Sequence, residues 1–431
     1  MVGEQSSLLE KNAASEKKST GNVTVKLTWP VARRRLNGVM RHTFHLLFVL
    51  AAVLAVGCPL ATSSSTAPAS STSASTASMS DGAVSLTDAN SPATGSSTTD
   101  RVKDERESSV LPLNELVSRT LEQNLRHRQL SSSTHGAWQI LHGILAYGPK
   151  FELQTPTGPE PALDYLLAGQ TVNGFEPEQG ETFGEQRRPG LRMAMQPSTK
   201  IGQGHRDQWL AVVAQSGLPL DAEIKGIDHT FTLDDWIRQA EFDVPRNLER
   251  EFSWSLIALT AYRDTNHRWV ARDGSQYSTE SLLGSELEQS LPNSVCGGTH
   301  RLIGMAMALD KRRREGQPIT GIWSEADAQI TAAIQMAQQN QNPDGSYSVA
   351  YLHRPGWTRD MGETLGSTGH VLEFLALAAP TATLTQPWVE RSVRRLCEVL
   401  EACSEVDLEC GVLYHALHGL SEYQKRMEPA S

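Results

Sequence analysis

From residue 110 onward, apolar residues recur with helical spacing, and two kinds of helix alternate along the chain. One kind is amphipathic, with an apolar stripe and a charged face. The other kind is apolar on nearly every side, as in HGAWQILHGILAY at 135–147. A helix that is apolar all round is buried on all sides, so we expect inner helices surrounded by outer ones.

Six helices of each kind follow one another. The amphipathic helices are predicted at 112–130, 161–169, 232–243, 279–291, 324–341 and 387–402, and the apolar helices at 135–147, 205–216, 251–262, 299–309, 367–378 and 410–420. The apolar helices begin about 43 to 70 residues apart, a spacing typical of arrays of helical hairpins.

This alternation predicts an all-α fold, an (α/α)6 toroid of six outer–inner helical hairpins within residues 106–431. An open solenoid is the alternative, but it would leave one face of each inner helix in water. The connections at 148–204 and 342–366 are rich in glycine and proline, and we expect them to form loops over one rim.

The N-terminal residues 1–60 form a basic leader, with eight Lys or Arg against three Asp or Glu. FHLLFVLAAVLAV at 44–56 is shorter than the roughly 20 residues of a spanning helix. A basic flank before a short apolar core is typical of an export signal. We therefore predict a signal peptide or membrane anchor at 43–58, a membrane partner, and an exported protein of the cell envelope, either anchored, periplasmic or secreted.

Leu54 to Cys58 reads LAVGC, which resembles a bacterial lipoprotein box and implies lipidation of Cys58. Cleavage after Gly57 and retention as an uncleaved anchor are the alternatives. Met40 could begin a complete signal peptide by itself. Residues 61–100 contain no Lys or Arg, and 29 of these 40 residues are Ser, Thr or Ala. Such a tract cannot bury enough apolar surface to fold, so we predict a disordered linker at 61–105.

The charge of the chain argues against a nucleic-acid partner. The whole chain of 431 residues has a formal net charge of -10, and residues 101–431 hold 31 basic and 43 acidic side chains. A general nucleic-acid-binding protein normally presents a basic face, so we predict no nucleic-acid partner.

One motif carries a family resemblance. Gln341-Asn342-Pro343-Asp344-Gly345-Ser346-Tyr347 resembles the QxxDGSW motif of the terpenoid cyclase and protein prenyltransferase superfamily, with Tyr in place of Trp. The motif lies where that superfamily has it, after an outer helix. The resemblance implies a toroid, and for Gln341, Asp344, Gly345 and Tyr347 a structural role, tying the outer helix to its neighbouring loop.

The catalytic motifs of that superfamily are not retained. Squalene-type cyclases use an Asp-rich acid, and no such run occurs here. Protein prenyltransferases bind zinc through an Asp-x-Cys pair, whereas Asp407 and Cys410 have a different spacing. Lanthionine cyclases bind zinc through one Cys and an adjacent Cys-His pair, and this chain has no adjacent Cys-His. The resemblance therefore implies a fold and no reaction.

Four of the predicted inner helices begin at or near a histidine. These candidate catalytic residues are His135, His205, His300 and His370. Inner helices of a toroid all run the same way, so their starts meet at one end, where free N–H groups favour an anion. Asp360 and Glu363, which precede His370, are the candidate carboxylates for acid–base chemistry. The alternative is that the histidines cap helices and that both carboxylates belong to a capped, solvated loop.

Cysteine and histidine together suggest a metal site, because thiolate and neutral imidazole are the preferred ligands of zinc. Cys296, His300 and Cys410 are the candidate ligands, and the glycines between Cys296 and His300 would let the backbone turn close to a bound group. A disulfide between Cys403 and Cys410 is the competing prediction for an exported protein, and it would remove Cys410 from the metal site.

Three functional hypotheses follow. The first is an exported, membrane-tethered toroid that binds a small-molecule or extended ligand at its His-rich mouth, with zinc and enzymatic activity as options. The second is a non-catalytic scaffold or binding module of the cell envelope. The third is a carbohydrate-active α/α-barrel enzyme, which would require two carboxylates facing each other across a cleft. The sequence names no specific reaction.

Overall fold

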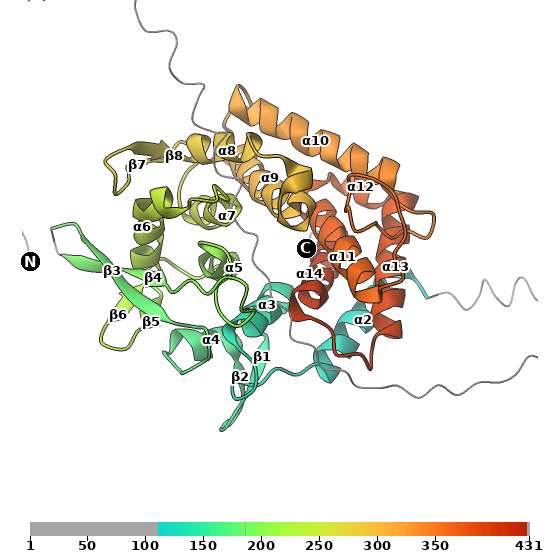
Figure 1. Cartoon of the computed structure of the whole chain (residues 1–431), viewed down its shortest axis with the longest axis horizontal. Helices are drawn as coiled ribbons and strands as arrows, with labels where there is room; N and C mark the ends of the chain where they lie inside the picture. The colour runs from blue at the N-terminus through green and yellow to red at the C-terminus, as the bar shows by residue number, and fades with distance from the viewer. Residues whose placement is uncertain (1–110, 186, 429–431) are drawn as a thin grey trace, which may run out of the picture. The chain divides into compact units, whose positions relative to one another are not determined.

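The computed structural model describes residues 111–185 and 187–428, and this part is mostly helical (Figure 1). The apolar helices predicted from the sequence are all present. They are α3 (Ala137–Tyr147), α5 (Gln208–Gln215), α7 (Ser253–Tyr262), α9 (Thr299–Arg314), α11 (Met361–Ala378) and α14 (Cys410–Met427). In α7, every residue from Ser253 to Thr260 is buried, as expected for a helix without a polar face.

These inner helices contact one another in chain order, and the last returns to the first. α3 contacts α5, α5 contacts α7, α7 contacts α9, α9 contacts α11, and α11 contacts α14, which packs against α3. Figure 1 shows the same arrangement, with the inner helices around a common centre. The cycle of contacts explains why these helices need no polar side: each has a neighbour on both flanks.

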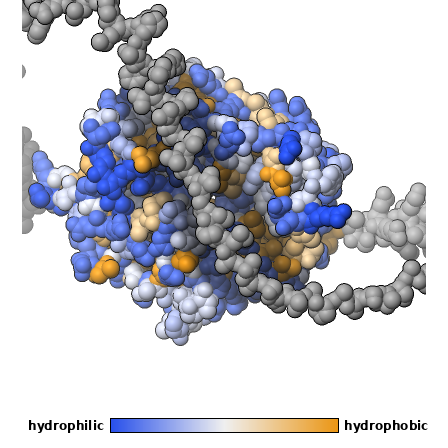
Figure 2. Space-filling model, in the orientation of Figure 1, coloured by the Kyte–Doolittle hydropathy of each residue, from blue (hydrophilic) through white to orange (hydrophobic). Residues whose placement is uncertain are grey.

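The amphipathic helices lie outside this cycle. They are α2 (Leu113–His127), α4 (Ala162–Leu167), α6 (Leu233–Asp243), α8 (Thr279–Leu287), α10 (Ile322–Asn340) and α13 (Pro387–Ala402). Each packs against an inner helix, as α10 does against α9 and α13 against α11. α12 (Thr381–Leu384) is a single turn that was not predicted. Hydrophilic residues cover most of the outer part of the face shown in Figure 2.

The connections contain more regular structure than predicted. In the part of the chain that the structure describes, four antiparallel two-stranded hairpins interrupt the helices, and two of them fall in the 148–204 connection that was expected to form loops. The strand pairs are β1 (Glu152–Thr155) with β2 (Gly158–Pro161), β3 (Pro177–Phe183) with β4 (Arg188–Met193), β5 (Glu223–Lys225) with β6 (Thr230–Thr232), and β7 (Arg268–Val270) with β8 (Gln276–Ser278). Short hairpins satisfy backbone groups that a long loop would leave unpaired.

The helix starts also differ from those predicted. α11 begins at Met361, six residues before the predicted start at 367, because the Asp360 side chain accepts a hydrogen bond from the backbone N–H of Glu363 and caps the helix. His370 therefore lies in the third turn of its helix rather than at its start. α5 begins at Gln208, three residues after His205.

The segment 341–347 follows α10 along the chain, and its side chains hydrogen-bond to α13. The amide Nε2 of Gln341 donates to the Trp388 carbonyl at 2.7 Å and to Ser392 Oγ at 2.8 Å. Asp344 accepts from Ser346 and pairs with Arg395 at 3.1 Å. Tyr347 is only 1% exposed. These contacts hold the segment 341–347 against α13 and have a structural role.

Gly345 is the least replaceable residue of this segment. Its φ is +91°, and a Cβ atom would lie 2.4 Å from the Arg391 carbonyl oxygen of α13. We expect Gly345→Ala to lower the free energy of unfolding by about 2 kcal/mol or more, since a left-handed backbone and a steric overlap act together. Urea unfolding measures this, with Gly316→Ala as the control, because Gly316 has φ +67° and open space around it. Equal losses in the two variants would contradict the steric argument.

The N-terminal predictions fall outside the described residues. This concerns the basic leader, the segment 43–58 with Cys58, and nearly all of the linker at 61–105. Within residues 111–428, no helix is both long and apolar enough to cross a bilayer.

Candidate metal centre

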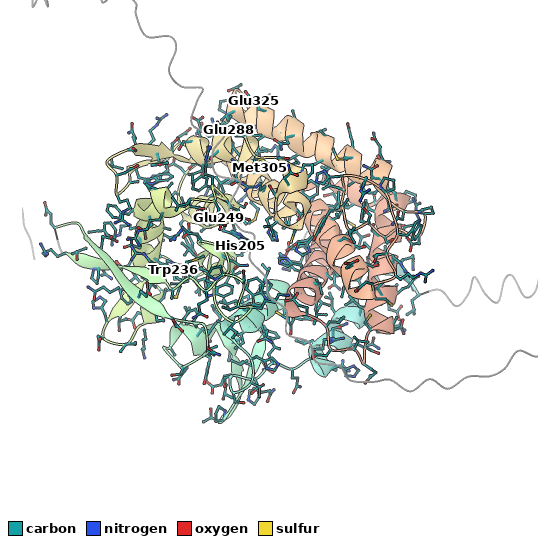
Figure 3. The ribbon with its side chains drawn as sticks, viewed as in Figure 1. His205, Trp236, Glu249, Glu288, Met305 and Glu325 are labelled. Atoms are coloured by element: carbon teal, nitrogen blue, oxygen red, sulfur yellow. The ribbon has the colours of Figure 1, made fainter. Side chains whose placement is uncertain are left out.

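The inner helices bring histidines together on the inside of the ring. Their rings contact one another in pairs: His300 lies 5.3 Å from His370 and 5.4 Å from His415 between centroids, and His370 lies 4.2 Å from His415. His142 lies 5.2 Å from His415, and His205 lies 6.0 Å from His300. Figure 3 shows His205 closer to the middle of the ring than Trp236 of α6. Four helices, α3, α9, α11 and α14, and the segment before α5 thus supply one cluster.

Cys296 meets this cluster from a strained turn. Cys296, Gly297 and Gly298 all have left-handed backbones, with φ of 51°, 61° and 78°, and α9 begins directly after them. A left-handed backbone is costly for a residue with a Cβ atom, so Cys296 is held there by its surroundings. The turn places the thiol of Cys296 beside the ring nitrogens of His300 and His370.

These three residues form a group that could hold a metal ion. One ligand atom from each of Cys296, His300 and His370 lies within 4.8 Å of the other two. His300 is 6% exposed, and neither of its ring nitrogens has a hydrogen-bond partner among the described residues. A buried polar group without a partner is unusual and calls for an explanation, which a bound ion would supply.

Electrostatics favour an ionised thiol at this position. Burial opposes ionisation of Cys296, but the positive charges of His370 and His300 hold its pKa well below the usual value. Burial likewise opposes charge on His300, yet Cys296 and Glu251 raise its pKa to about 10. Without a metal, these shifts favour a thiolate beside an imidazolium; a metal ion would take the place of the proton.

The second ring nitrogen of each histidine faces a protein acceptor. His370 Nδ1 lies 2.7 Å from the Gly366 carbonyl oxygen, and Nδ1 of His300 faces the Glu251 carboxylate at 3.9 Å. Glu251 also hydrogen-bonds Nδ1 of His205 at 2.7 Å. Acceptors behind the ring are typical of metal-binding histidines.

A second carboxylate lies deeper in the ring. Glu373 of α11 is 2% exposed, and its oxygens lie 2.9 Å from Nδ1 of His415 and 2.6 Å from Nδ1 of His418. Burial opposes ionisation of Glu373, but His415 and His418 hold its pKa well below normal. His370, Glu373 and His415 form the second grouping that could hold a metal ion. We assign Glu373 to orienting His415, since both of its oxygens are already engaged by imidazoles.

Three of the predicted histidines lie in the cluster and one does not. His205, His300 and His370 are present, whereas His135 remains in the turn before α3, where its Nδ1 accepts from the Ser131 backbone N–H at 2.9 Å. His135 stays outside the cluster because a hydrogen bond within its own turn holds the ring there. Asp360 and Glu363 are exposed; Asp360 caps α11, and Glu363 accepts from Thr358 at 2.8 Å.

The predicted metal ligand Cys410 is not part of either grouping. Its thiol lies 3.9 Å from the Trp138 carbonyl oxygen, and burial raises its pKa, so it stays protonated. Cys403 and Cys410 are both free thiols, so the disulfide alternative is not formed in this structure. Cys296 and His300 do lie together, and the third ligand position belongs to His370.

Sequence reasoning missed the two glutamates and Tyr351. Glu373 had a readable signal: it is the only charged residue in the apolar stretch STGHVLEFLALA, and it lies three residues after His370. A lone carboxylate on an all-apolar helix is buried and must have a partner. Tyr351 could not be found this way, because it comes from a loop that lies next to Cys296 only in the folded chain.

The pairing of His418 predicts a pH-dependent contribution to stability. Burial opposes charge on His418, but Glu373 and Glu422 raise its pKa to about 9. The folded state therefore holds a proton that the unfolded chain loses above its ordinary pKa of about 6.5. The stabilisation is fully present below about pH 6.5 and is lost as the pH rises through about 9.

We accordingly expect the difference in unfolding free energy between the wild type and His418→Gln to be largest at about pH 6 and to shrink toward about pH 9. Urea unfolding at several pH values measures this difference. His127→Gln, at an exposed position on α2, is the control and should show no such trend. A difference that grows with pH would contradict the charged state of His418.

Comparisons with known proteins give no further guide to this site. The chain matches no protein-family model, no curated protein and no solved structure. Its chemistry is therefore argued from the residues described above.

Proposed function

We propose that this chain is an exported (α/α)6 toroid whose mouth is a zinc-dependent ligand-binding centre. Cys296, His300 and His370 would hold the ion, and a fourth position would take water or a ligand. The observation that carries the proposal is His300, a buried imidazole with no hydrogen-bond partner among the described residues. It lies beside the Cys296 thiol, whose surroundings favour the ionised form. One sulfur and two imidazole ligands suit zinc, and three protein ligands are typical of sites that exchange the fourth.

The residues around these ligands have defined roles. The Gly366 carbonyl and Glu251 fix the orientation of His370 and His300, and Glu251 balances positive charge at the centre. Zinc with an open position would polarise an oxygen atom of a bound ligand or lower the pKa of a bound water. The contact ring supports a toroid, and the LAVGC segment supports tethering to a membrane through Cys58 or the apolar segment before it.

The test is metal analysis of the full chain. After expression with zinc and gel filtration, we expect about one zinc ion per chain, removed by a strong chelator and restored by added zinc. Cobalt in its place should give a thiolate-to-metal absorption band. His370→Gln should lose this ion, whereas His135→Gln should keep it, since His135 lies outside the cluster. Metal-free protein, or equal loss in both variants, would overturn the proposal.

The same turn supports one other chemistry, a thiolate nucleophile without metal. A cysteine whose pKa is lowered by neighbouring imidazoles is reactive at neutral pH. In that case the metal-free wild type would be alkylated by iodoacetamide at Cys296 far faster than at Cys403 or Cys410, and added zinc would not protect it. Protection by zinc would instead support the metal centre.

A further inference from the structure

Three tryptophans occupy the same position at the starts of three successive inner helices. Trp138, Trp209 and Trp254 are each the second residue of their helix, α3, α5 and α7, and His300 has the same place in α9. These helices contact one another in chain order and alternate with outer helices, so their starts lie at the same end of the ring. The three indoles therefore lie at the end of the ring that holds His300.

The indole N–H groups of these three residues lack a hydrogen-bond acceptor. The Nε1 atoms of Trp138, Trp209 and Trp254 are all buried, and none of them has a partner among the described residues. Trp209 and Trp254 are only 0% and 4% exposed. An indole nitrogen can donate but cannot accept, so each of these groups needs an acceptor, and bulk water does not reach them.

Three tryptophans outside the inner helices show that this fold supplies acceptors to other buried indoles. Nε1 of Trp269 donates to the Glu241 carbonyl at 2.7 Å, that of Trp323 to the Glu280 carboxylate at 2.9 Å, and that of Trp388 to the Gln386 side chain at 2.7 Å. These residues are at most 8% exposed. Among the described residues, the buried indoles without an acceptor are thus those of the inner helices.

Ring contacts join the unpartnered indoles to the proposed metal centre. Trp254 lies 4.9 Å from His300 between ring centroids, and Trp138 lies 6.0 Å from Trp209. Trp138 also lies 4.4 Å from His142, which belongs to the histidine cluster. A group that accepts hydrogen bonds from these indoles would therefore lie beside the histidines.

The acceptors that the chain itself offers in this region have other partners. Asp207, directly before α5, accepts from Ser255 Oγ at 2.5 Å, and Glu251 hydrogen-bonds Nδ1 of His205 at 2.7 Å. Both carboxylates are thus engaged by groups other than the indoles. The missing acceptor is best supplied by a ligand.

The chemistry of the site favours a carboxylate. The positive ends of four helix dipoles and three donors without acceptors favour an anion. The rings offer indoles and imidazoles, whereas phosphate is typically bound by arginine or lysine. A carboxylate carries a single charge, is planar, and has two oxygens that can accept several hydrogen bonds.

We propose that the indole N–H groups of Trp138, Trp209 and Trp254 bind a ligand carboxylate beside the Cys296 centre. The hydrogen bonds from the indoles require no metal. Only coordination of the same carboxylate to an ion rests on the proposed zinc centre.

The test is nuclear magnetic resonance of the full chain labelled with 15N-tryptophan and titrated with acetate. We expect acetate to move the indole resonances of Trp138, Trp209 and Trp254 downfield, because a hydrogen bond to a carboxylate deshields the proton. The indoles of Trp323 and Trp388 already have acceptors, so their resonances should stay in place. Acetamide, a neutral molecule of the same shape, should have little effect. Unmoved resonances of the three inner indoles, or equal shifts with acetamide, would overturn the proposal.

A phenylalanine variant removes one donor and keeps an aromatic ring. Trp209→Phe should weaken acetate binding by about tenfold or more, as expected for the loss of a hydrogen bond to a charged group. Trp388→Phe is the matched control, since its indole donates to Gln386, and it should bind acetate as the wild type does. Equal weakening in both variants would contradict the role of the indoles. Should a variant fail to fold, the resonances of the wild type decide the proposal.

Two further probes define the ligand. Tighter binding of phenylacetate than of acetate would assign the carboxylate to a larger ligand whose body packs on the rings, and the reverse order to a small free anion. Either order supports a carboxylate site. Tighter binding of inorganic phosphate than of both carboxylates would overturn the assignment.

The titration is repeated on zinc-loaded and chelated protein, so that the two proposals can fail separately. Indole shifts in chelated protein support the carboxylate site whatever the zinc content. One zinc ion per chain without indole shifts leaves the metal centre standing and overturns the carboxylate site. Where both hold, acetate should also change the absorption band of the cobalt form.

Discussion

Cys296→Ser is expected to lower the affinity for zinc by more than about 100-fold and to abolish the thiolate-to-cobalt absorption band. Cys296 is the only sulfur atom in either grouping that could hold a metal among residues 111–428. Removing a ligand should cost more than disturbing the groups behind it, which alone typically costs 10- to 100-fold. Competition with a chromogenic chelator measures the affinity, and absorption spectra of the cobalt form report the sulfur ligand.

Cys410→Ser is the matched control. Both thiols lie at the starts of inner helices, but burial keeps Cys410 protonated, and it contacts the Trp138 carbonyl oxygen instead of the histidines. This variant should bind zinc as the wild type does and should keep the cobalt band. Wild-type zinc affinity in the Cys296→Ser variant would contradict the proposed ligand set, and loss of zinc in the Cys410→Ser variant would show that Cys410 takes part.

Glu373→Leu is expected to lower the free energy of unfolding by about 3–5 kcal/mol, the cost of breaking a buried charged pair by removing one partner. Glu373 accepts hydrogen bonds from His415 and His418, and all three residues are buried. Leucine would leave Nδ1 of both imidazoles buried without its acceptor. Glu373→Gln should cost less, about 1–3 kcal/mol, since its carbonyl oxygen still accepts one hydrogen bond.

Urea unfolding followed by far-UV circular dichroism measures both variants, on chelated protein so that any change in metal binding does not contribute. Glu398→Gln on the exposed face of α13 is the control and should stay within about 0.5 kcal/mol of the wild type. A Glu373→Leu variant as stable as the wild type would show that the histidines find other partners.

Much of the architecture could be predicted from the sequence, because burial on all sides leaves a direct trace in composition. A helix such as 251–262 has almost no polar residue, and the structure buries it throughout. Helix boundaries were less accurate. The start of α11 depends on one cap at Asp360, and the hairpins within 148–204 depend on pairing between strands whose sequences show no clear alternation.

The site was predicted in part. His205, His300 and His370 were identified because they recur at similar positions in several of the helical hairpins. His135 occurs at a similar position, yet a local hydrogen bond to Ser131 holds it away from the other rings. The sequence could not separate these cases, because His370 also bonds to a residue four positions away, the Gly366 carbonyl, and still contacts rings from other helices.

By itself, the sequence determined the alternation of outer and inner helices. It therefore also determined which residues are buried and which histidines lie near the starts of the inner helices. Only the tertiary structure decided which of those residues meet. Cys296 faces His300 and His370, while Cys410 lies apart, because the rotation of each helix about its axis and the left-handed turn before α9 set the direction of each side chain. Periodicity fixes the buried face of a helix, but contacts between side chains that are distant in sequence depend on how the helices pack.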